Sequence, residues 1–110
     1  MEIISSLQND RIKNIIKLFT KSKERKKQGL IVAEGARELS LAQNTNYEID
    51  SVFVCTELYM KSDYPDVLEK INENKIYEVT LPVFQKIAYR ENSDGIITLM
   101  KLPDNDLKKY

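Results

Sequence analysis

Eight cationic side chains between residues 11 and 27 form the densest group of chemically active residues in the chain. Lys13, Lys17 and Lys21 recur at every fourth position, so a helix would align them on one surface stripe that could track a phosphate backbone. The alternative is a solvated helix face followed by a basic loop. The one aromatic residue among these cations, Phe19, falls on the apolar stripe of the same predicted helix, so a stacking platform for bases is not expected here. The full set is Arg11, Lys13, Lys17, Lys21, Lys23, Arg25, Lys26 and Lys27.

A second candidate site follows the apolar run at residues 30–33. Four apolar residues in a row predict a strand covered on both faces, and Gly35 relaxes the turn into a helix. Open α/β sheets bind their ligands at the carboxyl ends of the strands. Glu34 and Arg37 would therefore project where a partner could contact them. The alternative is a local ion pair between Glu34 and Arg37 at the start of the helix.

The residues that are missing exclude several kinds of chemistry. The chain has no histidine, one cysteine, no P-loop and no GxGxxG fingerprint. These absences argue against histidine acid/base catalysis, thiolate zinc sites and the familiar nucleotide-binding loops. We therefore predict no catalytic, cofactor-binding or metal-binding residue in this chain. Cys55 lies in an apolar run and is predicted to be a small buried hydrophobe.

Length and charge set the broad class. A chain of 110 residues with 42% hydrophobic and 31% charged side chains predicts one globular domain. The formal net charge is zero, but the charges are unevenly distributed. The chain up to Lys27 has eight basic and three acidic side chains, and the remainder has nine basic and fourteen acidic ones. The first part therefore has a net charge of +5 and the second a net charge of −5, which predicts that one face binds an anionic partner. The chain has no membrane-length apolar run and no signal-peptide pattern, and we expect it in the cytoplasm.

Strands and helices alternate along the chain. Asn9 is predicted to cap a helix whose apolar stripe is Ile12, Ile15, Ile16 and Phe19. This alternation predicts an α/β fold: a single three-layer α/β/α sandwich with a mixed or largely parallel sheet of about four strands. Beyond the strand at residues 30–34, we expect strands at 48–56, 75–79 and 95–100, a helix at 63–72, a short helix capped by Thr80 with Pro82 in its first turn, and a polar loop at 89–94.

Four segments resemble a known family in content and order. They are residues 4–13 (ISSLQNDRIK), the basic segment 23–27, residues 32–38 (VAEGARE), and residues 83–88 (VFQKIA) followed by Gly95-Ile96-Ile97. Together they resemble the amino-terminal substrate-binding domain of SpoU (TrmH-type) RNA 2′-O-ribose methyltransferases. The resemblance covers nearly the whole chain.

The resemblance implies a fold like that of small ribosomal proteins that bind structured RNA, placed before a knotted catalytic domain. The family's catalytic residues and its S-adenosylmethionine site lie in that second domain, so none of them transfers to this sequence. The implied parent protein is an enzyme, but this chain alone is not catalytic and holds no cofactor. The RNA-contact positions that transfer are the basic residues of the first helix and following turn, together with Glu34, Gly35, Arg37 and Arg90.

The resemblance also predicts the domain organisation and the partners. Residues 1–101 would form an RNA substrate-binding domain with the helical basic arm 9–27 packed on it, and residues 102–110 a linker or the start of the missing catalytic domain. The expected partner is structured RNA, either rRNA or tRNA, and not a membrane. The full-length protein would dimerise through the missing domain. The alternatives are a free-standing RNA-binding or ribosome-associated protein, and a protein-interaction module whose basic arm docks on an acidic partner.

Overall fold

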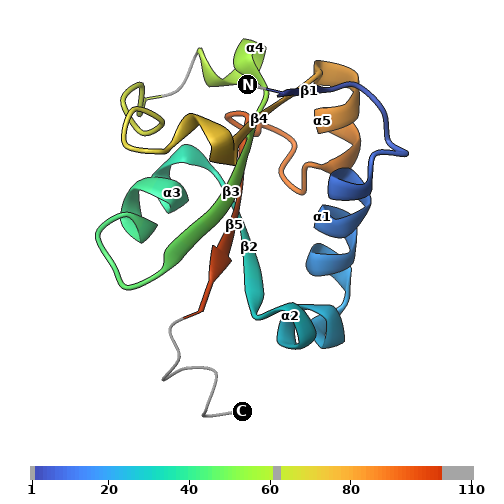
Figure 1. Cartoon of the computed structure of the whole chain (residues 1–110). Helices are drawn as coiled ribbons and strands as arrows, with labels where there is room; N and C mark the ends of the chain where they lie inside the picture. The colour runs from blue at the N-terminus through green and yellow to red at the C-terminus, as the bar shows by residue number, and fades with distance from the viewer. Residues whose placement is uncertain (1, 61–62, 103–110) are drawn as a thin grey trace.

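A mixed sheet of five strands runs through the middle of the molecule in a computed structural model that describes residues 2–60 and 63–102 (Figure 1). The order across the sheet is β1-β4-β3-β5-β2. β4 runs parallel to β1 and β3, whereas β5 runs antiparallel to β3 and β2. We expected about four strands, and the additional one is the short edge strand β1. The strands are β1 (Glu2–Ile4), β2 (Leu30–Glu34), β3 (Glu48–Val54), β4 (Ile76–Val79) and β5 (Ile96–Lys101).

Helical segments cover both faces of this sheet, which confirms the three-layer α/β/α architecture (Figure 1). On one face α1 and α5 bury Ile12, Ile15 and Phe84 against the sheet. On the other face α3 and residues 63–72 bury Leu39 and Val67. The helices are α1 (Asp10–Thr20), α2 (Ser22–Gln28), α3 (Ala36–Ala42), α4 (Thr56–Tyr59) and α5 (Leu81–Ile87), with a 3₁₀ turn η1 (Glu73–Lys75) before β4.

Helix α1 starts as predicted and buries most of the predicted stripe. The Asn9 side-chain oxygen accepts the Arg11 N–H at 2.8 Å, which confirms the cap. Ile12 and Ile15 are buried together with Leu18, whereas Ile16 is 42% exposed, so its predicted core position is wrong. Phe19 is partly buried and packs against the same cluster, so Ile16 alone departs from the predicted stripe.

Residues 63–72 do not form the predicted helix. They form a series of turns, because side chains bind the carbonyls that a helix would use. The Tyr59 hydroxyl lies 2.9 Å and 2.7 Å from the carbonyl oxygens of Tyr64 and Pro65, and Gln43 Nε2 donates to the Val67 carbonyl at 2.9 Å. Partial burial raises the pKa of the Tyr59 hydroxyl above its ordinary value.

The predictions for the short helix at Pro82 and for Cys55 hold with small changes. Helix α5 has Pro82 in its first turn and buries Val83, Phe84 and Ile87, but Thr80 makes no side-chain capping bond. Cys55 is buried, as expected. Within residues 2–60 and 63–102, no helix is long and apolar enough to cross a membrane.

Candidate functional site

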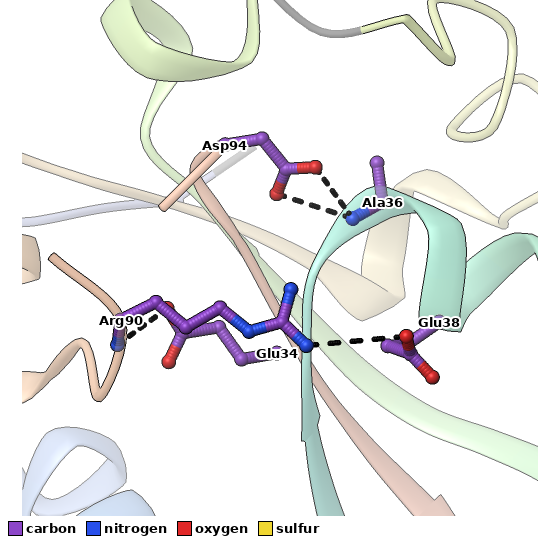
Figure 2. A network of polar contacts seen from close by, with 5 residues as sticks. All are labelled: Glu34, Ala36, Glu38, Arg90 and Asp94. Carbon is purple, nitrogen blue, oxygen red and sulfur yellow. Dashed lines mark hydrogen bonds and ion pairs between the residues drawn. The ribbon is translucent and has the colours of Figure 1, made fainter. Parts of the chain in front are cut away.

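The carboxyl end of β2 is joined to the loop before β5 by a buried carboxylate. Glu34 is only 6% exposed, and one of its oxygens accepts the backbone N–H of Tyr89 at 2.7 Å. Its other oxygen accepts the backbone N–H of Arg90 at 3.3 Å (Figure 2). We expected Glu34 to project towards a partner, and this expectation is wrong. The carboxylate lies below the surface because the last position of β2 faces the α1 and α5 side of the sheet, where these two N–H groups need an acceptor.

The turn between β2 and α3 depends on Gly35. Its φ of 118° is a conformation that side chains rarely adopt, and its N–H donates to the Ile96 carbonyl at 2.8 Å. A Cβ atom at this position would lie 3.0 Å from Arg90 Nη1. Both carboxylate oxygens of Asp94 accept the Ala36 N–H, at 3.1 Å and 3.0 Å (Figure 2). Gly35 therefore leaves room for Arg90 to cross the turn.

Arg90, and not Arg37, makes the ion pair at this turn. Arg90 Nη2 lies 3.9 Å from Glu38 Oε1, and both side chains are substantially exposed (Figure 2). The alternative of a Glu34–Arg37 pair is therefore wrong. Arg37 is exposed, and within the described residues it makes no ion pair. The resemblance named Glu34, Gly35, Arg37 and Arg90 as RNA contacts. The structure brings Arg90 to Glu34 and Gly35, which was not predicted, whereas Arg37 lies beside that cluster on α3.

Helices α1 and α2 present six exposed lysines, which we call the basic surface. No lysine of this surface takes part in an ion pair within residues 2–60 and 63–102, so its charge is not neutralised there. Lys21 forms the corner between the two helices, with φ −125° and ψ 107°, and does not continue the α1 stripe as predicted. The basic surface consists of Lys13, Lys17, Lys21, Lys23, Lys26 and Lys27.

The two arginines of this region are used inside the domain. Arg25 Nη1 donates to the Leu18 carbonyl at 2.7 Å and to the Phe19 carbonyl at 3.4 Å, so it caps the end of α1. The Arg11 guanidinium lies 4.3 Å from the centre of the Tyr77 ring. Both residues thus stabilise the position of α1, a role that sequence analysis did not separate from phosphate binding.

An exposed aromatic residue that was not predicted from the sequence links α1 to the turn at Gly35. Tyr89 is 71% exposed, and its ring centre lies 5.0 Å from that of Phe19 on α1. Phe19, the one aromatic residue among the cations in sequence, packs against the core, whereas folding places the exposed Tyr89 at the end of their helix. Its position next to Arg90 in the loop at 89–94 was the available signal. A pocket of about 530 Å³ opens beside this loop, between it and α5.

Comparison with protein-family models matches residues 9–98 to the MRM3-like substrate binding domain. The match spans most of the chain. This chain belongs to the MRM3-like substrate-binding domain family. Curated proteins gave no significant match.

Solved structures of larger methyltransferases contain a region that resembles this MRM3-like domain. An RNA 2′-O ribose methyltransferase is 29% identical with a TM-score of 0.81, and the match covers 98% of this chain and 40% of that one. The rRNA methyltransferase from Sinorhizobium meliloti (21% identity, TM-score 0.72, 93% and 37% covered) shows the same fold. The SpoU methyltransferase AviRb from Streptomyces viridochromogenes in complex with AdoMet also shows this fold, with 13% identity and a TM-score of 0.71. That match covers 92% of this chain and 38% of AviRb. The resemblance to the SpoU amino-terminal domain is therefore confirmed, and the chain spans about 40% of the length of these matches.

The MRM3-like domain offers binding chemistry on its surface. The basic surface supplies positive charge, and the turn at Gly35 supplies the exposed Arg37 and Arg90. In the described part of the chain, no three histidine, cysteine, aspartate or glutamate side chains are grouped so that they could hold a metal ion. The arrangement is suited to contacting an extended anion over α1, α2 and the loop at 89–94.

Proposed function

We propose that this chain is the RNA-binding domain of an rRNA or tRNA 2′-O-ribose methyltransferase. The observation that carries the proposal is the basic surface, whose six lysines are exposed and free of ion pairs in the part of the chain that the structure describes. Uncompensated lysines on two consecutive helices suit a polyanion, because phosphate contacts release counterions and supply most of the affinity. Membership of a substrate-binding family supports RNA as that polyanion.

The exposed residues divide into two roles under this proposal. The six lysines of the basic surface contact phosphates, and Arg37 and Arg90 extend the contact to the turn at Gly35. Glu34 and Gly35 act by positioning Arg90 and the loop around it, since Glu34 is buried and Gly35 has no side chain. Arg11 and Arg25 hold α1 in place through Tyr77 and the carbonyls at the end of α1.

Methyl transfer belongs to a separate domain in this proposal. Residues 1–101 form the RNA-binding domain, residues 102–110 are a linker or the start of a catalytic domain, and the full-length protein dimerises through that domain in the cytoplasm. The 40% coverage of the similar RNA 2′-O ribose methyltransferase supports a larger parent protein. Residues 103–110 lie outside the described residues.

The described residues of this chain leave no glycine-rich loop that could bind S-adenosylmethionine. It contains three glycines, and each is required by the fold itself. Gly29 ends α2 in a left-handed conformation, Gly35 makes the turn to α3, and a Cβ atom at Gly95 would lie 2.6 Å from the Cys55 carbonyl oxygen. No glycine-rich loop remains to bind the methyl donor, so we derive no methyl-transfer step in this chain.

Calorimetric titration of the 110-residue chain tests the proposal. Structured RNA, such as a tRNA transcript, should bind at low salt, and S-adenosylmethionine should give no saturable heat at micromolar concentration. Saturable binding of the cofactor would show that the domain assignment is wrong. Absence of RNA binding at low salt would favour the protein-interaction module. The coding sequence beyond Tyr110 separates the enzyme from a free-standing RNA-binding protein.

A further inference from the structure

We infer that Tyr89 and the adjoining pocket form a site for one unpaired nucleobase of the RNA. This inference rests on the proposed function and deepens it, because the basic surface alone would recognise only phosphates. An unpaired base can stack on an aromatic ring and use its polar edge for hydrogen bonds. Tyr89 and the pocket provide both kinds of contact beside the basic surface.

The Tyr89 ring is exposed and held in place. It packs against Phe19 with a ring-centre distance of 5.0 Å and an angle of 45° between the ring planes, yet 71% of the residue is accessible. Its backbone N–H is bound to the buried carboxylate of Glu34 at 2.7 Å. An aromatic side chain with two anchors and a free surface loses little freedom when a base stacks on it, which favours binding.

The pocket beside Tyr89 combines apolar and polar walls. Leu58, Phe84 and Ala88 contribute the apolar part of the lining. A volume of about 530 Å³ lies in the range of small-ligand pockets. An open pocket of this kind accommodates a flat ring.

The polar part of the lining suits the edge of a base better than a phosphate. Arg90 and Glu91 contribute opposite charges, and Gln85 and Asn92 contribute amides that can both donate and accept. A carboxylate next to the site would repel a phosphate. A base edge, in contrast, presents donors and acceptors together, so both charges and both amides could be used.

The pocket adjoins the helix that carries part of the basic surface. Phe19, which supports Tyr89, lies on α1 about 200° around the helix axis from Lys17, so the Tyr89 ring flanks α1 away from the lysine stripe. A nucleic acid that contacts Lys17 and crosses α1 reaches the Tyr89 ring, and a base turned out of the strand at that point would meet the pocket. The same protein surface then binds phosphates by charge and one base by stacking.

Fluorescence anisotropy with the 110-residue chain tests this inference on three short RNAs. They are a hairpin with an unpaired loop, the same hairpin with an abasic loop, and a fully paired duplex with the same number of phosphates. Tyr89→Ala should weaken binding of the hairpin by roughly 5- to 100-fold, the range expected for losing one base stack. Its binding of the duplex and of the abasic hairpin should not change. Tyr89→Phe should retain the hairpin affinity, because the ring remains.

Controls separate this site from the rest of the proposal. Leu41→Ala removes an exposed apolar side chain from α3, on the other face of the sheet, and should leave every affinity unchanged. If Tyr89→Ala fails to fold, the wild-type protein with the abasic hairpin gives the answer, since loss of the loop bases should weaken binding equally. Unchanged affinity for the abasic hairpin, or for the hairpin with a folded Tyr89→Ala variant, would overturn the inference while RNA binding stands. Failure of the wild-type protein to bind any of the RNAs would overturn the proposed function as well.

Discussion

At the scale of single residues, Glu34 connects two segments that are far apart in the sequence. Its buried carboxylate accepts the N–H groups of Tyr89 and Arg90, 55 and 56 residues away. Two backbone donors would lose their protein acceptor without it, and an unsatisfied buried donor is costly. Glu34 thereby fixes the backbone at Tyr89 and Arg90, two of the exposed residues that we assign to RNA.

Glu34→Ala should lower the free energy of unfolding by about 1–3 kcal/mol, because the N–H groups of Tyr89 and Arg90 lose their acceptor. Glu38→Ala is the matched control. The Glu38 carboxylate lies 3.9 Å from Arg90 at the surface, and removing an exposed pair of this kind should change stability by less than about 1 kcal/mol. Urea denaturation measures both variants. Equal midpoints for the two would show that the buried carboxylate does not hold the loop.

The residue-scale predictions from the sequence succeeded where the cause is local. A glycine after a buried strand predicted the turn, and the positive φ of Gly35 agrees with it. Asn9 before an apolar helical pattern predicted the cap. The partners of Glu34 and the Phe19–Tyr89 contact could not be predicted, because they depend on which loop the sheet order brings next to β2 and α1.

At the scale of the elements, β5 organises the sheet. It lies between β3 and β2, and Ile96, Ile97, Leu99 and Met100 are buried along it. Thr98 is also fully buried, and its hydroxyl has no hydrogen-bond partner within the described residues. The strand therefore retains a polar atom where an apolar one of the same shape would fit.

Thr98→Val should leave the stability unchanged or raise it by up to about 1 kcal/mol, because it replaces an unpartnered buried hydroxyl with a methyl group. Thr98→Ser is the opposite change, since it keeps the hydroxyl and removes a buried methyl group. It should lower the stability by about 1 kcal/mol. Thermal and urea denaturation of both variants measure the effect. A clearly destabilised Thr98→Val protein would mean that the hydroxyl has a partner.

Among the elements, one predicted helix does not form. The spacing of Val67, Leu68 and Ile71 favoured a helix at 63–72, and all three residues do pack on the face of the sheet that α3 covers. The backbone takes turns because Tyr59 and Gln43, from α4 and the end of α3, bind its carbonyl oxygens. Periodicity thus identified the buried side chains but not the backbone, and the three-residue strand β1 was too short to show any period.

At the scale of the whole molecule, charge is divided between two parts of the chain. The first 27 residues have a net charge of +5, and six of their lysines lie exposed on α1 and α2. The charge division and the alternation of strands and helices were readable from composition and pattern, and so was the three-layer fold. The position of α1 next to the turn at Gly35 could not be predicted from the sequence, because it depends on how α1 packs beside the loop at 89–94.

The salt dependence of RNA binding tests most directly whether the basic surface carries the affinity. If about five lysines contact phosphates, log K should fall against log salt with a slope of roughly −3.5 to −4.5. Replacing Lys17 and Lys21 with alanine should flatten that slope by about 1.5 to 2 units and weaken all RNAs alike. The control replaces Lys70 and Lys101, which lie outside the basic surface, and changes the net charge equally. We predict a flatter slope for the first pair alone, and an equal slope for both double variants would contradict the assignment of the basic surface to RNA.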